Sequence, residues 1–275
     1  MPFLMYDYPN VKSLSQKSAK LKEILHPWSS ALIAYSGGVD SAFLLWTAHE
    51  VLGNRVTGVL GDSPSLPRSE HRAALDFASR HQLPVEVIST TELSNPDYAA
   101  NPSNRCFFCR SELFQKMESR ATQRKVSLLA YGENADDAKE VRAGRAAAGH
   151  FQVVAPLRDA DLTKAEIRQL AREAGLDVSE KPASPCLSSR LAPGLPVSIE
   201  RLAAIEKAET AVRARGFRIV RVRHLGKKAL LQVSPEETPR LQQPDLRKEL
   251  MNDLLASGFS EVEFDPVGYH GSGLR

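Results

Sequence analysis

The chain has 275 residues, of which 42% are hydrophobic and 25% charged, as in an ordinary globular protein. Its formal net charge of +3 is too small to indicate nucleic-acid binding by itself, and no apolar run approaches the roughly 20 residues that span a bilayer. Three cysteines cannot form the framework of a disulfide-stabilised secreted protein, and the N-terminal sequence has no signal-peptide pattern. We therefore expect a cytoplasmic protein without a membrane partner.

Strand and helix patterns alternate through the first two thirds of the chain. Short apolar runs bounded by glycine, proline or polar residues predict five buried strands, at residues 31–36, 55–61, 84–89, 127–132 and 151–156. The best-defined helix covers residues 163–175, where Thr163 and Glu166 have the spacing of a capping box and Gly175 suits the end. This alternation predicts an α/β fold of βαβ units around a mostly parallel sheet.

The sequence changes in character after about residue 180. The stretch 181–196, "KPASPCLSSRLAPGLP", carries four prolines and predicts an ordered loop. A helix at 198–216, strands at 217–225 and 228–234, a helix at 236–258 and a strand at 260–266 follow. We therefore predict two domains, an α/β domain over residues 1–180 and a small α+β module over residues 181–275.

The segment "ALIAYSGGVDSAFLLW" carries the most information about ligands. A predicted strand runs into Ser36, Gly37, Gly38, Val39, Asp40 and Ser41, and then into an apolar helix. Paired glycines allow a sharp turn, and the amides at the start of the helix suit a phosphate. The string is neither a Walker P-loop nor the G-x-G-x-x-G dinucleotide motif. A glycine turn without a ligand is the alternative.

Ser-Gly-Gly-Val-Asp-Ser resembles the PP-loop of the ATP pyrophosphatase superfamily, whose members cleave ATP between the α and β phosphates and adenylate an oxygen of the substrate. The resemblance implies ATP and Mg²⁺ as cofactors, with Asp40 in a catalytic role. It places Gly61, Asp62 and Ser63 near the adenosine and Gly132 near the nucleotide. Asp136, Asp137 and Arg142 of "YGENADDAKEVRAGR" then belong near the reaction centre. The alternative for that stretch is a solvated acidic helix start.

The run from residue 153 to 194, with "KPASPCLSSR" inside it, is similar to the LarE family of sulfur transferases, and the resemblance covers nearly the whole chain. It implies adenylation of a carboxylate of a pyridinium dicarboxylate mononucleotide, which sulfur then converts to a thiocarboxylate of the nickel-pincer nucleotide cofactor. Ser189 and Arg190 match the family's grip on the substrate phosphate. Arg221 and Arg223 alternate along a predicted strand, so both project from one face and could clamp a phosphate as well. A solvated basic edge strand is the alternative for the two arginines of residues 217–225.

The same resemblance also implies a metal-binding residue and an oligomeric state. Glu209 matches a position that binds a metal in the family, although the acidic partners expected after it are replaced by Gln232 and Arg240. The family also implies a homo-oligomer, with a hexamer as the candidate size. The partners are then a small nucleotide substrate and a sulfide or other sulfur donor, without nucleic acid.

The cysteines depart from the self-consuming members of that family, in which one cysteine gives up its own sulfur. Cys106 and Cys109 are additional, and Cys186 lies one residue nearer to Ser188-Ser189-Arg190 than the sacrificial cysteine would. Three thiolates can hold a 4Fe-4S cluster that leaves one iron open, which the three-cysteine members of the family suggest. A disulfide, a zinc site, unliganded core thiols and sacrifice of Cys186 alone remain alternatives.

Two other functions fit parts of the sequence. A tRNA thiolase of the same superfamily would need an RNA-binding surface, for which only the basic stretch "RARGFRIVRVRHLGKK" offers itself. The second alternative is of a different class, a nucleotide-binding or sulfur-carrier protein that catalyses nothing.

Overall fold

The computed structural model describes residues 13–137 and 143–269. The chain forms two compact units, each assembled from three segments. Unit 1 is drawn from Met1–Gly61, Ala73–Ile88 and Leu113–Pro182, and unit 2 from Asp62–Arg72, Ser89–Glu112 and Ala183–Arg275. Both units thus take segments from before and after residue 180, and the predicted domain boundary there stays a prediction.

A four-stranded parallel sheet forms the centre of unit 1. Its strands are β1 (Ala31–Ala34), β2 (Val56–Asp62), β3 (Val85–Ser89) and β4 (Leu128–Tyr131), in the order β3-β2-β1-β4. The central strand β1 pairs in parallel with both β2 and β4. Strands β1 and β4 are buried along most of their length, as a parallel sheet covered on both faces requires, whereas in the edge strand β3 only Ile88 is buried.

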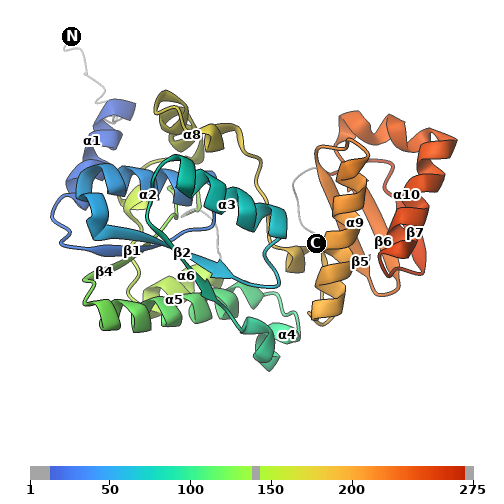
Figure 1. Cartoon of the computed structure of the whole chain (residues 1–275), viewed down its shortest axis with the longest axis horizontal. Helices are drawn as coiled ribbons and strands as arrows, with labels where there is room; N and C mark the ends of the chain where they lie inside the picture. The colour runs from blue at the N-terminus through green and yellow to red at the C-terminus, as the bar shows by residue number, and fades with distance from the viewer. Residues whose placement is uncertain (1–12, 138–142, 270–275) are drawn as a thin grey trace, which may run out of the picture. The chain divides into compact units, whose positions relative to one another are not determined.

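Helices cover both faces of this sheet. The helices that contribute to unit 1 are α1 (Leu14–Leu25), α2 (Val39–Leu52), α3 (Arg68–Arg80), α5 (Arg105–Arg124), α6 (Ala143–His150), α7 (Pro156–Asp159) and α8 (Lys164–Glu173). Helices α2 and α3 lie on one face and α5 on the other (Figure 1). The ring of Phe114 on α5 meets that of Tyr131 on β4 at 5.8 Å, which fastens α5 to the sheet.

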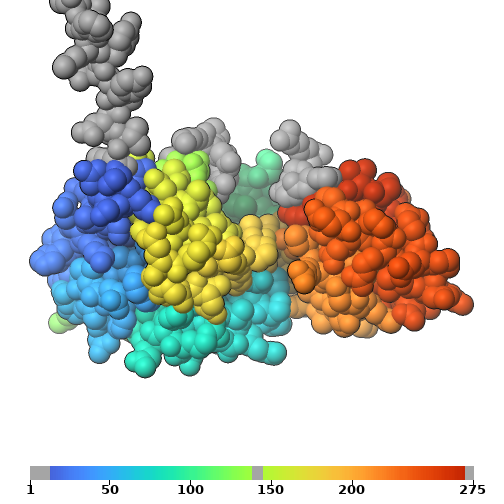
Figure 2. All heavy atoms as spheres, turned by 90° about the horizontal axis from the view of Figure 1, so that it is seen from above, coloured from blue at the N-terminus to red at the C-terminus, as the bar shows by residue number. Residues whose placement is uncertain are grey.

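Helix α8 confirms its sequence prediction in detail. Thr163 is the N-cap, and its side chain and that of Glu166 form the reciprocal bonds of a capping box. Ile167 and Ala171 are buried, and α8 packs against α2, as the yellow and blue segments show in Figure 2. This packing brings the first residue of α8 beside the first turn of α2.

The fifth predicted strand, residues 151–156, is wrong as a strand. Only a single bridge joins Val154 to Ala130 of β4, through Tyr131 N–H to Val154 O at 3.0 Å and Val154 N–H to Leu129 O at 2.9 Å. Gln152 has a φ of +53°, and Pro156 begins α7. A left-handed residue before Val154 and a helix start after it leave no room for a longer ladder.

Unit 2 contains a three-stranded sheet covered by two helices. Strands β5 (Val220–Leu225), β6 (Lys228–Val233) and β7 (Glu261–Phe264) lie in that order, with β5 antiparallel and β7 parallel to β6. Helices α9 (Ile199–Ala214) and α10 (Pro244–Ala256) bury Ile205, Leu250 and Leu254 in one apolar core with the sheet. The predicted fold class, a parallel α/β domain with a small C-terminal α+β module, is confirmed.

The predicted helix at 236–258 is divided in the structure. Residues Pro235–Gln242 form the 3₁₀ helix η6, and Pro244 is the first residue of α10, where a proline is tolerated because it needs no amide donor. The remaining short elements are η1 (Gly53–Arg55), η2 (Glu92–Ser94), α4 (Pro96–Ala99), η4 (Asp177–Glu180) and η5 (Leu187–Arg190). In the parts of the chain that the structure describes, no helix has the length and apolar character to cross a membrane.

Candidate functional site

The loop Ser36–Ser41 joins β1 to α2 in unit 1, as predicted. Gly37 has a φ of +70°, and a Cβ on it would lie 2.6 Å from the Cβ of Ala74, so the turn requires glycine. Ser36 N–H donates to Ser41 Oγ at 3.1 Å, and Ser41 Oγ–H donates to Gly38 O at 3.0 Å. Gly38 is the N-cap of α2 and offers no side-chain cap, so the first amides of the helix point toward an anion site.

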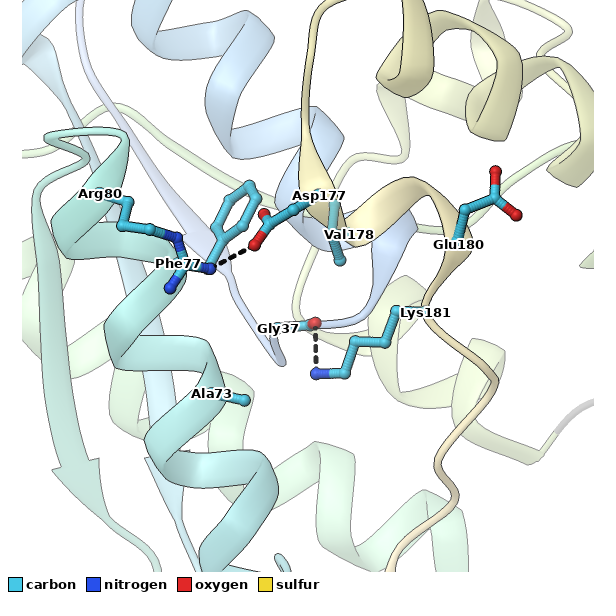
Figure 3. Close-up of a pocket in the computed structure, with 8 residues that line it drawn as sticks. All are labelled: Gly37, Ala73, Phe77, Arg80, Asp177, Val178, Glu180 and Lys181. Carbon is cyan, nitrogen blue, oxygen red and sulfur yellow. Dashed lines mark hydrogen bonds and ion pairs between the residues drawn. The ribbon is translucent and has the colours of Figure 1, made fainter. Parts of the chain in front are cut away.

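Two lysines reach this loop from the segments that follow β4. Lys164 Nζ lies 2.5 Å from Asp40 Oδ2, and Lys181 Nζ donates to Gly37 O at 3.0 Å (Figure 3). The helix start at Gly38 and two ammonium groups together favour a polyphosphate at the loop. Neither lysine could be predicted from the sequence as part of this site, because nothing in their spacing connects them to a loop more than 120 residues earlier.

A cavity of about 390 Å³ lies beside the loop within unit 1. Gly37 and Lys181 line it together with Ala73 and Phe77 of α3 and Val178 of η4, while Arg80 and Asp177 form an ion pair at 2.5 Å in its wall (Figure 3). Glu180 points away from Gly37 in this view. The loop is therefore open to a volume that could hold phosphate groups.

Asp40 combines burial with a single ion pair. Burial raises the pKa of this carboxyl above its ordinary value, although Lys164 acts in the opposite direction. Its Oδ1 atom is buried and accepts no hydrogen bond. A buried carboxylate oxygen without a donor is the kind of ligand that Mg²⁺ takes, so Asp40 fits a magnesium ion that accompanies ATP. Such an ion would polarise the phosphate oxygens.

The segment after β4 lies against the same loop. A Cβ on Gly132 would lie 2.8 Å from Ser41 N, so this glycine permits the close approach. Asp136 Oδ2 accepts the Lys164 amide at 2.9 Å, and Asp137 Oδ2 accepts the Asn134 amide at 3.3 Å. The predicted residues of this segment thus adjoin the loop, except that Arg142 lies outside the described residues.

The buried carboxylate of Glu133 stabilises this segment through two ion pairs. Its carboxylate receives Arg145 Nε at 2.8 Å and Arg158 Nη1 at 3.0 Å. Burial alone would raise the pKa of Glu133, but the arginines outweigh it and hold the pKa below the ordinary value. The carboxylate therefore stays charged and fixes the start of the segment.

The three residues predicted near the adenosine lie at the carboxyl end of β2. Gly61 belongs to unit 1, whereas Asp62 and Ser63 belong to unit 2. Asp62 Oδ1 accepts Arg68 Nη1 at 2.6 Å, and Ser63 Oγ donates to the buried carboxylate of Glu92. Their role at the adenosine stays a prediction.

All three cysteines belong to unit 2. Cys106 and Cys109 lie in the first two turns of α5, and Cys186 is the N-cap of η5. Cys106 is exposed, and the other two thiols are half-buried. Burial raises the pKa of Cys109, and the charges of Glu92, Cys186 and Cys106 raise it further. The three thiols are therefore near enough to interact electrostatically.

The donor set suits a 4Fe-4S cluster in its chemistry, since three thiolates leave one iron open. Yet across residues 13–137 and 143–269 no three cysteine, histidine or acidic side chains are grouped so that they could hold a metal ion. The predicted metal position Glu209 lies in no such group within the same residues.

Arg221 and Arg223 both project from β5 and are buried, with 6% and 3% of their surface exposed. Arg221 Nη2 donates to Ala183 O at 3.1 Å, and Arg223 Nη1 donates to Ser189 O at 2.9 Å. The ring of Tyr269 lies against both guanidinium groups, at 5.0 and 5.8 Å. Burial lowers the pKa of both arginines, and neighbouring Arg190 lowers them further. These buried, mutually repelling cations favour an anion.

Arg190 and Glu209 form the centre of this region. Arg190 is fully buried and donates to Glu209 Oε1 at 2.9 Å and to Cys186 O at 2.8 Å. Glu209 also receives Arg213 Nη2 at 2.7 Å and Val222 N–H at 3.2 Å. Ser189 Oγ donates to Cys186 O at 2.7 Å. Ser189 and Arg190, predicted at the substrate phosphate, therefore also hold the loop of Cys186.

The fold and the loop of unit 1 define an α/β protein of the PP-loop ATP pyrophosphatase type, and comparisons with known proteins narrow this class. An uncharacterised protein of Synechocystis is 35% identical over 95% of this chain and 98% of its own length. A pyridinium-3,5-bisthiocarboxylic acid mononucleotide synthase of Lactiplantibacillus plantarum is 28% identical over 77% of each chain. One subunit of a glutamine-hydrolysing GMP synthase from Thermoplasma volcanium is 27% identical over 55% of this chain and 53% of its own.

No family model matches the chain. The relatives from Synechocystis and Lactiplantibacillus plantarum nevertheless cover 95% and 77% of it. The chain belongs to the LarE-type family within the PP-loop ATP pyrophosphatase superfamily.

Proposed function

We propose that this protein is an ATP-dependent sulfur transferase that adenylates a carboxylate of a pyridinium dicarboxylate mononucleotide and converts it to a thiocarboxylate, a step in making the nickel-pincer nucleotide cofactor. The observation that carries the proposal is the content of unit 2, which holds all three thiols of the chain and two buried arginines of β5. The relative from Lactiplantibacillus plantarum bears a name that describes such a product.

In the first half-reaction a carboxylate oxygen of the substrate attacks the α phosphorus of ATP. The bond between the α phosphorus and the bridging oxygen breaks, and pyrophosphate leaves with the electron pair. The amides at the start of α2 and the ammonium groups of Lys164 and Lys181 stabilise the charge that develops on the pyrophosphate. Asp40 holds Lys164 at the loop and would hold Mg²⁺.

In the second half-reaction a sulfur nucleophile attacks the carbonyl carbon of the acyl-adenylate. AMP leaves with the oxygen that came from the carboxylate, and a thiocarboxylate remains. Arg221 and Arg223, with Ser189, would bind the phosphate of the mononucleotide, because buried guanidinium groups that repel each other are stabilised by an anion. Cys106, Cys109 and Cys186 would hold a 4Fe-4S cluster, which would make the sulfur supply reusable.

Anaerobic turnover tests this function directly. We expect the protein to release pyrophosphate and AMP from ATP only when the pyridinium dicarboxylate mononucleotide is present, and to form a thiocarboxylate when sulfide is added. Tight binding of tRNA with a steep salt dependence, and no turnover of the small nucleotide, would contradict the proposal. Release of neither product with any carboxylated nucleotide would favour a binding protein without catalytic activity.

The sulfur source is tested separately, by iron and sulfide analysis of protein purified without oxygen. Iron and sulfide in a ratio near that of a cluster support the reusable supply. Iron near zero, with Cys106→Ala and Cys109→Ala still active, contradicts it. Loss of the mass of H₂S from Cys186 after a single turnover would instead identify a sacrificial reaction.

A further inference from the structure

Three hydroxyl groups form a closed ring of hydrogen bonds inside unit 2, and none of them takes part in the proposed reaction. Ser65 Oγ lies 2.7 Å from Tyr98 Oη and 2.7 Å from Ser188 Oγ, and Tyr98 Oη lies 2.8 Å from Ser188 Oγ. All three residues are buried, with at most 3% of their surface exposed. Each hydroxyl can donate once and still accept, so a ring of three satisfies every member without water.

The ring joins three segments that are far apart in the sequence. Ser65 follows β2, Tyr98 lies on α4 just before the helix of Cys106 and Cys109, and Ser188 lies two residues after Cys186. Leu187 N–H, between Cys186 and Ser188, donates to Ser65 O at 2.8 Å. The loop of Cys186 is therefore fastened both by its backbone and by the hydroxyl ring.

Further bonds join the same two cysteine-bearing segments. Asn101 Nδ2 donates to Ala192 O at 2.8 Å and to Leu195 O at 2.9 Å, and Val197 N–H donates to Ala99 O at 2.7 Å. Asn101 Oδ1 in turn accepts Arg105, the first residue of α5. The segment before Cys106 and the segment after Cys186 are thus bonded to each other along their length.

The charges of two thiols also act on the Tyr98 hydroxyl of the ring. Burial raises the pKa of Tyr98, and the charges of Cys186 and Cys109 raise it further. The phenol consequently stays protonated and remains a donor within the ring. A neutral network of this kind is rigid, because losing one member leaves one buried hydroxyl without an acceptor and another without a donor.

We propose that Tyr98, Ser65 and Ser188 are positioning residues that hold Cys186 at a fixed distance from Cys109 in the protein without metal or substrate. This proposal rests on the proposed role of these thiols in sulfur transfer. The positioning proposal is narrower than the proposed function, however, because it concerns only the distance between the Cys109 and Cys186 thiols. It can therefore be tested in the absence of ATP, of nucleotide substrate and of iron.

The test is the rate at which a short bis-maleimide joins Cys109 to Cys186, located by mass spectrometry in anaerobic, metal-depleted protein. A Cys106→Ser background prevents the competing link within α5. We expect Tyr98→Phe and Ser188→Ala each to lower the rate of cross-linking about fivefold, roughly the factor that one hydrogen bond contributes. The rates of single alkylation at each thiol should change less, because they do not depend on the distance between the thiols.

Tyr35→Phe in the same background is the matched control. Tyr35 is a buried tyrosine of unit 1 whose hydroxyl donates to Ala74 O at 2.8 Å, so its loss has a similar cost in stability but no connection to the thiols. Cross-linking at the parent rate in Tyr35→Phe and a lowered rate in Tyr98→Phe support the proposal. Equal rates in all variants, or an equal fall in Tyr35→Phe, overturn it.

The outcome is separable from that of the proposed function. Unchanged cross-linking in a protein that makes thiocarboxylate would reject the positioning role and leave the sulfur transferase standing. Lowered cross-linking in a protein that turns over no carboxylated nucleotide would retain the ring as a positioning device and reject the reaction.

Discussion

Asp40 is the acidic residue of the loop Ser36–Ser41, and its buried carboxylate contacts Lys164 through one oxygen while the other oxygen has no donor. Asp40→Asn keeps the shape of the side chain but removes the charge. We expect pyrophosphate release to fall by about 100-fold or more, as when one electrostatic contact to a transition state is lost. Pyrophosphate release measured with saturating ATP checks this.

Asp76→Asn is the control for that substitution, since Asp76 is an exposed carboxylate of α3 in the same unit. It should leave both turnover and thermal stability unchanged. If Asp40→Asn retains full adenylation, the loop does not act as a PP-loop and the assignment of the ATP site fails.

Glu209 provides a second prediction at this scale, which concerns stability. Replacing Glu209 by Gln leaves the fully buried Arg190 without its counter-charge, and removal of one partner of a buried pair costs about 3–5 kcal/mol. Urea unfolding at neutral pH measures this loss. Glu261→Gln, at an exposed position of β7, should cost much less.

The same pair predicts a pH dependence with a definite sign. Burial would raise the pKa of Glu209, but Arg190 and Arg213 outweigh it, so the folded-state pKa lies below the ordinary 4.5. The stabilisation is therefore fully present above about pH 4.5 and is lost as the pH falls through the folded-state value. Unfolding curves of the Glu209→Gln protein should show a weaker decline in stability over that acidic range than those of the parent protein.

Among the elements, the turn between β1 and α2 depends on one glycine. Gly37→Ala places a Cβ 2.6 Å from that of Ala74, in addition to the cost of a positive φ, so the loop must shift and ATP binding should be lost. Gly175→Ala at a φ of +71° is the matched control, because no atom lies within 4 Å of its added Cβ. Calorimetric titration with a non-hydrolysable ATP analogue distinguishes the two.

Both alanine variants should lose about 1–2 kcal/mol of stability from the left-handed backbone alone. Only Gly37→Ala should lose the nucleotide. Equal ATP affinity in the two variants would show that the phosphate does not lie at this turn.

The elements themselves were largely predictable, because apolar runs and capping residues are local signals. Four of the five strands predicted before residue 180, and the capping box of α8, follow from a few adjacent residues. The segment 151–156 has the same apolar run, but Gln152 and Pro156 restrict the backbone on either side, and so it forms a single bridge. Pro244 is similarly the first residue of α10, whereas the apolar pattern alone predicts one helix that continues through this proline.

At the scale of the whole molecule, pattern reasoning found the loop, the cysteines and the arginine pair, because each is a short motif. It could not find Lys164, Lys181 or the ring of Ser65, Tyr98 and Ser188, since these contacts join segments that only the tertiary fold brings together. One sequence feature could have indicated Lys181 as a site residue, namely its position at the start of a proline-rich loop that is predicted to be ordered. The hydroxyl ring had none.

In the proposed reaction the loop Ser36–Ser41, which would serve adenylation, belongs to unit 1, and the three thiols, which would serve sulfur transfer, belong to unit 2. Substituting Ser for Cys106, Cys109 and Cys186 together should therefore leave substrate-dependent pyrophosphate release near its parent rate while abolishing thiocarboxylate formation. Exchange of labelled pyrophosphate into ATP, followed beside mass analysis of the nucleotide product, measures both steps in one sample. Ser111→Ala, on the same helix as Cys109, is the control and should retain both steps. If the triple variant loses the exchange reaction as well, the thiols take part in adenylation and the two half-reactions are not divided between the units.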